Sequence, residues 1–140
     1  MTLDFGTFHQ NGAAGPLGFS LFNPSGDRTG LNLTGVAGAG DTAMLSTDLA
    51  LFTNLLQGNS TGFSALFNTA QIGTYNAMYT LNLEDYLPGG AASSTRRAYS
   101  LQLNLTGTVA AVPVPPSLWL LMSGIAGMAA VGRRRSVLAG

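Results

Sequence analysis

Apolar and polar residues alternate along two long stretches in the second half of the chain. Between residues 75 and 83, and again between residues 99 and 109, apolar side chains recur at odd positions. Most of the intervening residues are Asn, Thr, Ser or Gln. A period of two places one face of a strand in a core and the other in water, as in an antiparallel sheet. Both stretches are therefore predicted to be strands.

Shorter apolar stretches lie upstream, separated by residues that favour turns. We predict strands at residues 3–8, 17–22 and 62–67, and an edge strand at 30–35. Residues 12–16 and 23–27 are rich in Gly, Pro and Asn, which favour turns. Residues 36–40 and 87–94 are predicted to be flexible loops. Several short strands with turn signals between them indicate an all-β, antiparallel, immunoglobulin-like β-sandwich over residues 1–109.

The pattern between residues 41 and 56 is ambiguous. Its apolar residues partly fit a helical stripe, but the segment lies between two β stretches. We interpret it as a strand with irregular flanks.

An uncharged apolar run follows the last predicted strand. It extends from Leu118 to Val131 and is preceded by a proline-rich linker at residues 110–117. The run is shorter than the roughly 20 residues that cross a bilayer. A buried C-terminal helix of a soluble domain is the alternative, but such a helix would have a polar face, and this run has none. We therefore expect a transmembrane helix at residues 118–132 and a basic cytoplasmic tail at 133–140.

The polar and aromatic residues around this run suit a membrane segment. Trp119 lies at one end, where an amphipathic ring favours the membrane–water interface. Arg133, Arg134 and Arg135 follow the other end and would hold it in the cytoplasm.

The order of these parts resembles the PEP-CTERM sorting signal, most closely its VPLPA variant. That signal combines a V-P-x-P motif, a Trp-Leu-Leu helix, a Ser-Gly pair with further glycines, and terminal arginines. Here Val114 replaces the Glu of the best-known form, and Pro116 replaces the Ala of the variant. The matching residues are Val112, Pro113, Val114, Pro115, Trp119, Leu120, Leu121, Ser123, Gly124, Gly127, Arg133, Arg134 and Arg135.

The resemblance implies a protein exported by a Gram-negative bacterium and processed by an exosortase, a membrane-embedded cysteine transpeptidase. The enzyme would cleave near Val112–Pro116, and the catalytic residues would lie on that enzyme. The implied partners are membrane lipid, the exosortase and exopolysaccharide. The implied route leads from the inner membrane to the cell surface or the extracellular matrix.

Two further stretches resemble immunoglobulin-like domains of the ASH/hydin or choice-of-anchor kind. The sequence L-D-F-G-T-F at residues 3–8 and F-S-L-F-N at 19–23 resemble their opening strands. The sequence at residues 73–83 resembles their sixth strand. This resemblance implies a sandwich fold and no particular binding site.

Composition narrows the possible functions. Charged residues are 9% of the chain, and lysine and cysteine are absent. Before the C-terminal tail, acidic residues outnumber basic ones, which argues against a nucleic-acid partner. The absence of cysteine excludes disulfides and thiolate zinc sites.

Few residues suggest catalysis. His9 is the only histidine, and no G-x-S-x-G motif accompanies it. Glu84 and Asp85 are adjacent, so in a strand they would point to opposite faces rather than flank one bond. Asp27, Asp41 and Asp48 lack the dense spacing of a calcium loop. We expect no enzyme activity, no metal and no cofactor.

Two functions remain open at this point. The first is a non-enzymatic surface or matrix protein with a C-terminal sorting signal. The alternative is the membrane-proximal fragment of a larger secreted enzyme or adhesin, held by a C-terminal anchor. Residues 1–6 lack the basic and apolar regions of a signal peptide, so we expect further sequence upstream.

Overall fold

The chain folds into two β-sheets followed by one helix. The computed structural model describes residues 1–26, 29–87, 97–113 and 115–138, with side chains up to residue 130. Within these ranges the elements are β1 (Thr2–His9), β2 (Leu17–Phe22), β3 (Gly30–Gly40), β4 (Leu45–Thr47), β5 (Phe52–Leu55), β6 (Ser60–Phe67), β7 (Gly73–Tyr86), β8 (Ala98–Ala110) and α1 (Pro116–Leu138).

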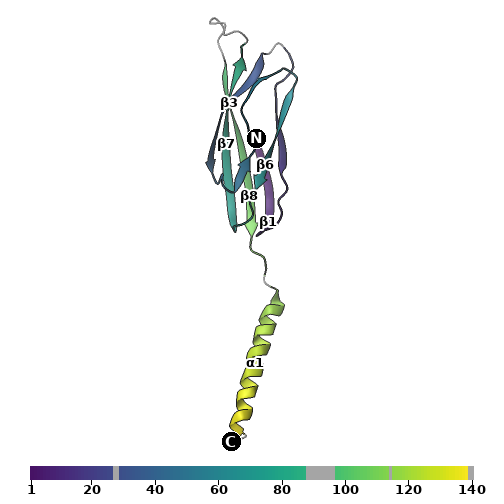
Figure 1. Cartoon of the computed structure of the whole chain (residues 1–140), viewed down its shortest axis with the longest axis vertical. Coiled ribbons are helices and arrows are strands. Elements are labelled where there is room, and N and C mark those ends of the chain that lie inside the picture. The colour runs from purple at the N-terminus through teal and green to yellow at the C-terminus, as the bar shows by residue number, and fades with distance from the viewer. Residues whose placement is uncertain (27–28, 88–96, 114, 139–140) are drawn as a thin grey trace.

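The strands form two layers that face each other, as a sandwich does (Figure 1). The larger sheet has the order β1-β8-β7-β3-β5, and the smaller has the order β2-β6-β4. The prediction of a mostly β fold with two facing sheets is therefore confirmed.

One pair departs from the antiparallel arrangement that the sequence predicted. β1 pairs with β8 in parallel, so the larger sheet is mixed. The chain leaves β1 for β2, which belongs to the other sheet, so no hairpin joins β1 to β8. Without a tight hairpin, nothing forces these first and last strands to run in opposite directions.

The core lies between the sheets and is built from the alternating residues. Leu81 from β7 and Leu105 from β8 are almost fully buried, as are Leu33 and Val109. The ring of Phe67 from the smaller sheet lies 5.4 Å from the ring of Phe5. The period-two patterns therefore mark the core correctly along β7 and from Leu103 onward in β8, whereas Tyr99 and Leu101 at the start of β8 are exposed. Of the predicted loop at 87–94, residues 88–94 lie outside the described residues.

The third strand is longer and more central than predicted. β3 continues through residues 36–40, where we expected a loop, and lies between β7 and β5 rather than at an edge. Its pairing with β7 shifts register between Leu33 and Gly35. At Gly38 a Cβ atom would come within 3.1 Å of the Tyr79 ring. The small residues of β3 thus allow close packing against β7. Composition alone does not distinguish such a strand from a flexible loop, because both are rich in small residues.

Residues 41–56 do not form the single strand that the ambiguous pattern suggested. A turn at residues 41–44 leads into β4, which belongs to the smaller sheet. β5 follows and pairs with β3 in the larger sheet. The segment crosses between the layers, so its buried side chains follow neither a helical nor a strand period, and Leu45 lies in the core.

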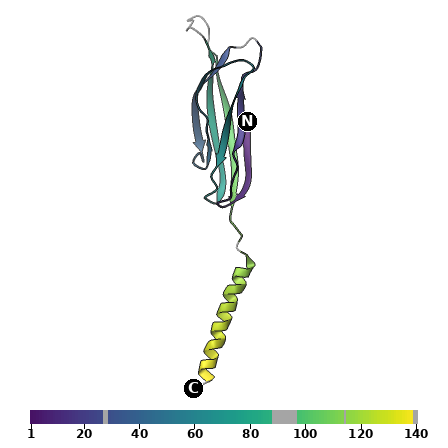
Figure 2. The same ribbon diagram turned by 45° about the vertical axis from the view of Figure 1, so that its right-hand side comes forward.

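The C-terminal helix stands apart from the sandwich. In both ribbon views α1 extends away from the sheets beyond a short linker (Figures 1 and 2). The helix begins at Pro116, two residues before the predicted start, and continues to Leu138. It therefore includes the positions of the three arginines, for which we expected a separate tail from residue 133.

Candidate functional site

The proline-rich linker is open to solvent where the structure describes it. Val112 is 59% exposed, and Pro113 and Pro115 are also exposed. Val114, the central residue of the expected motif, lies outside the described residues. Proline fixes φ and keeps the preceding residue extended, so this segment presents its backbone without a strand partner. Pro116 begins α1, a position that proline favours because the first helical N–H has no intrahelical acceptor.

The helix after the linker exposes its apolar side chains. Trp119 is 74% exposed and Leu120 71% exposed, and Leu121 and Met128 are similarly open. Gly124 and Gly127 have no other residue within reach of a Cβ atom. The Ser123 hydroxyl donates to the Leu120 carbonyl at 2.9 Å, so the one hydroxyl group in this run is satisfied within the helix. Exposed apolar surface of this kind is typical of a binding region for a partner or for lipid.

The membrane-spanning character expected for residues 118–132 requires a correction. Within the described residues, no helix combines the length and the apolarity that crossing a bilayer requires. Ser117, Ser123 and the glycines dilute the apolar run, and the arginines follow it closely.

The arginine positions are placed by the backbone alone. Arg133, Arg134 and Arg135 fall in the last turns of α1, and their side chains lie outside the described residues.

The acidic side chains that the structure describes hold turns and strand ends. Asp41 accepts a hydrogen bond from the Asn76 amide at 2.9 Å, and Asp48 accepts one from the Ser64 amide at 2.6 Å. Asp27 lies outside the described residues. Among the described residues, no group of three potential ligands could hold a metal ion.

Asp4 has a pKa below its ordinary value. It accepts hydrogen bonds from the Gly6 amide at 3.0 Å and the Thr106 hydroxyl at 2.9 Å. The Gly6 bond, followed by the Thr106 bond, lowers the pKa of Asp4 because both favour the charged form. The bond between Asp4 and Thr106 links β1 to β8 on the solvent-exposed face of the sheet.

The other candidates for chemistry lie apart from one another. His9 is exposed at the end of β1. Glu84 and Asp85 lie near the far end of β7, where Asn32 donates to Glu84 and the Arg97 amide donates to Asp85. The structure does not bring the histidine and the carboxylates into one site.

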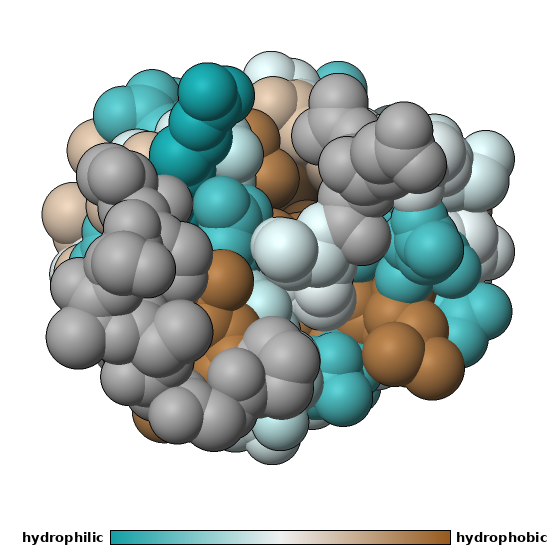
Figure 3. Space-filling model, turned by 90° about the horizontal axis from the view of Figure 1, so that it is seen from above, coloured by the Kyte–Doolittle hydropathy of each residue, from teal (hydrophilic) through white to brown (hydrophobic). Residues whose placement is uncertain are grey.

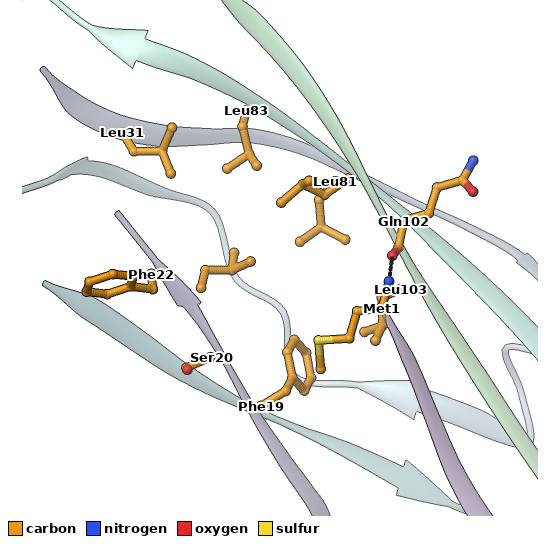
Figure 4. Close-up of a pocket in the computed structure, with 11 residues that line it drawn as sticks. Met1, Phe19, Ser20, Phe22, Leu31, Leu81, Leu83, Gln102 and Leu103 are labelled. Carbon is orange, nitrogen blue, oxygen red and sulfur yellow. Dashed lines mark hydrogen bonds between the residues drawn. The ribbon is translucent and has the colours of Figure 1, made fainter. Parts of the chain in front are cut away.

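An apolar pocket between the two sheets was not predicted from the sequence. It has a volume of about 230 Å³, and Phe19 and Leu21 of β2 face Leu81, Leu101 and other leucines of the larger sheet. Figure 4 shows Phe19, Leu81 and Leu83 around the pocket, with Met1 at one side. Apolar side chains also reach the surface at the end of the sandwich away from α1 (Figure 3). Alternation predicted that the leucines of β7 and β8 face inward, but it could not show that a cavity remains between them and β2.

The comparisons with known proteins give no family. No protein-family model matches the chain, and no characterised protein matches it.

Proposed function

We propose that this chain is an exported, non-enzymatic bacterial surface or matrix protein whose C-terminal segment is a sorting signal cut by an exosortase. The supporting observation is the position of the motif. The V-P-x-P sequence falls in a linker whose described residues are exposed, outside the folded sandwich. A protease needs extended, accessible backbone, and the sandwich could keep its fold after the cut.

The exposed helix supports the same proposal. A single helix with apolar residues on all sides gains little by remaining in water, so it favours contact with lipid or with a membrane-embedded enzyme. The proposal requires recognition of this helix and does not depend on its crossing the bilayer. In this account, membrane lipid and the exosortase are the partners of residues 112–135, and exopolysaccharide surrounds the released sandwich.

We further propose that the sandwich is immunoglobulin-like. Two facing sheets over one core suit that class. In this role the sandwich is the displayed part, and it carries no catalytic residue.

The mass of the mature protein tests this proposal. The chain, fused to an export signal, is produced in a Gram-negative host that has an exosortase and in the same host without it. We expect the mature form to lose the residues after the proline motif only when the exosortase is present. The double variant Pro113→Ala, Pro115→Ala should remain uncut, whereas Pro16→Ala, a matched change between β1 and β2, should be cut normally. An intact C-terminus in both hosts would overturn the proposal.

A further inference from the structure

The strands β1 and β8 lie side by side and run in the same direction. They pair in parallel from Thr2, opposite Asn104, to His9, opposite Ala110. The start of β1 therefore lies at one end of this pair, and the end of β8 lies at the other. In Figure 1 the N marker lies farther from α1 than the end of β8 does. Whatever precedes Thr2 and whatever follows Ala110 thus pull on these two strands in opposite directions along their length.

The parallel arrangement determines how such a pull loads the hydrogen bonds. When two strands are pulled past each other lengthwise, the bonds between them must give way together. When two strands are pulled apart from one end, the bonds break one after another. If β1 and β8 were antiparallel, the start of β1 and the end of β8 would lie together, and the same pull would break their bonds singly. One main-chain bond adds little, so the number that share the load decides the resistance.

Hydrogen bonds join β1 to β8 at both ends of the pair. The amino group of Met1 donates to the Gln102 carbonyl, and its carbonyl accepts from the Asn104 amide, each at 2.9 Å. At the other end the Gln10 amide donates to the Ala110 carbonyl, also at 2.9 Å. The strands cannot slide past each other without breaking bonds along the whole pair.

Two aromatic side chains hold β1 in addition to its main-chain bonds. The rings of Phe5 and Phe8 lie 5.4 Å and 6.2 Å from the ring of Phe67 on β6. The pairing with β8 shifts register between Asp4 and Thr7. This bulge turns both phenylalanines, which are three positions apart, toward the same core. A lengthwise pull on β1 must therefore also drag its rings out of the core.

The turn that follows β1 is fastened to the body of the sandwich. The Asn11 amide donates to the Thr69 carbonyl at 2.9 Å, and the Thr69 hydroxyl donates to the Gly12 carbonyl at 2.6 Å. The side chain of Gln10 donates to the Ala70 carbonyl at 2.9 Å. These bonds join the end of β1 to the loop between β6 and β7, so the far end of β1 stays in place when its start is pulled.

We propose that the sandwich is a mechanical link, in which β1 and β8 form a clamp that resists tension between the two ends of the domain. Tension enters β1 through its start and enters β8 through the residues that follow Ala110. The clamp lies within residues 1–110, so this role goes beyond the sorting signal and does not depend on it. It suits a protein outside the cell, where one end is held while the other is pulled.

Pulling on single molecules of the full chain tests the clamp. The chain has no cysteine, so two introduced cysteines place the handles at chosen positions. The lengthwise pair is Thr2→Cys with Ala111→Cys, and the control pair is Gln71→Cys with Ala111→Cys, all at exposed positions. The control pair pulls apart adjacent ends of β7 and β8, where Gly73 lies opposite Val109. We expect the lengthwise pair to unfold at a force about twofold higher or more, because more bonds share the load.

Three variants, pulled with the lengthwise pair, separate the clamp from overall stability. Leu3 follows Met1 by two residues in the strand, so its N–H also points toward β8. Leu3→Pro removes this donor and should lower the unfolding force, whereas Leu3→Val keeps it and should leave the force nearly unchanged. Leu45→Ala removes a fully buried side chain from β4 in the other sheet. It should destabilise the fold but lower the force less than Leu3→Pro does.

Equal unfolding forces for the two handle pairs would overturn the proposal, and this comparison does not require Leu3→Pro to fold. A force that Leu3→Pro leaves unchanged would show that the bonds between β1 and β8 do not carry the load. A loss of force with Leu45→Ala as large as that with Leu3→Pro would assign the resistance to overall stability instead of the clamp.

Discussion

The sandwich and the C-terminal helix are both rich in apolar residues, but the sandwich buries many of these side chains and the helix exposes them. Leu105 in the sandwich is fully buried between two sheets, whereas Leu120 in α1 is 71% exposed. Composition does not distinguish the two leucines. The pattern does, because the strands alternate with a period of two while the helix is apolar on every side.

This difference separates a part that buries its own apolar side chains from a part that leaves them exposed. The sandwich removes its apolar face from water by pairing two sheets, so its stability comes from within. An isolated helix with exposed apolar side chains gains no such burial. The same kind of substitution should therefore have different effects in the two regions.

The largest contrast is between two leucine truncations. Leu105→Ala should lower the free energy of unfolding of the sandwich by about 2–5 kcal/mol, because it removes buried methyl groups and leaves a cavity. Leu120→Ala should leave this free energy unchanged within about 0.5 kcal/mol. Denaturant unfolding of both variants measures the difference, and equal losses would show that α1 is part of the sandwich core.

Two glycine substitutions should differ in sign. At Gly107 a Cβ atom would lie 2.7 Å from the Phe67 ring, which is itself held among other aromatic rings. Gly107→Ala should therefore destabilise the sandwich by about 1–3 kcal/mol. Gly127→Ala has open space and should instead increase the helical content of α1, because alanine favours helix by about 1 kcal/mol over glycine. Circular dichroism during unfolding reports both, and a Gly107→Ala variant as stable as the natural chain would contradict this packing.

Removing one hydroxyl group should have a smaller effect. The Tyr79 hydroxyl donates to the Leu45 carbonyl at 2.8 Å inside the core, and burial raises the pKa of this phenol. Tyr79→Phe should cost about 1 kcal/mol, since the buried carbonyl loses its partner. Tyr99→Phe, at a side chain that is 42% exposed, is the control and should cost close to nothing. A neutral Tyr79→Phe variant would mean that the carbonyl finds another donor.

The smallest expected effect concerns pH. The folded-state pKa of Asp4 lies below its ordinary value of 3.8, so its charged form stabilises the fold at higher pH. This contribution is fully present above the ordinary pKa and is lost as the pH falls through the folded-state pKa. The stability difference between the natural chain and Asp4→Asn should therefore shrink as the pH is lowered below 3.8. A difference that grows on acidification would reverse the sign of the shift.

The sequence predicted the sandwich layout well where alternation is long. β7 and β8 were identified because their inward residues face one continuous core. The prediction failed at β3, where Gly and Ala allow close packing rather than flexibility, and at residues 41–56, which cross between the sheets. The parallel pairing of β1 with β8 depends on contacts between the two ends of the chain, which no local pattern encodes.

The candidate sites were predictable to different degrees. The linker and helix carry local signals, namely prolines and an uncharged, mostly apolar run, and the structure places both outside the sandwich. The apolar pocket was missed because it depends on how β2 packs against β7 and β8, and these strands are far apart in the sequence.

Truncation of the C-terminal segment tests the separation of the two regions most directly. The free energy of unfolding is measured for the full chain and for a chain that ends at Ala111, both in the same mild detergent. We predict equal values within about 0.5 kcal/mol, because α1 adds no packing to the sandwich. A loss of more than about 2 kcal/mol, comparable to that of a buried leucine, would contradict the account.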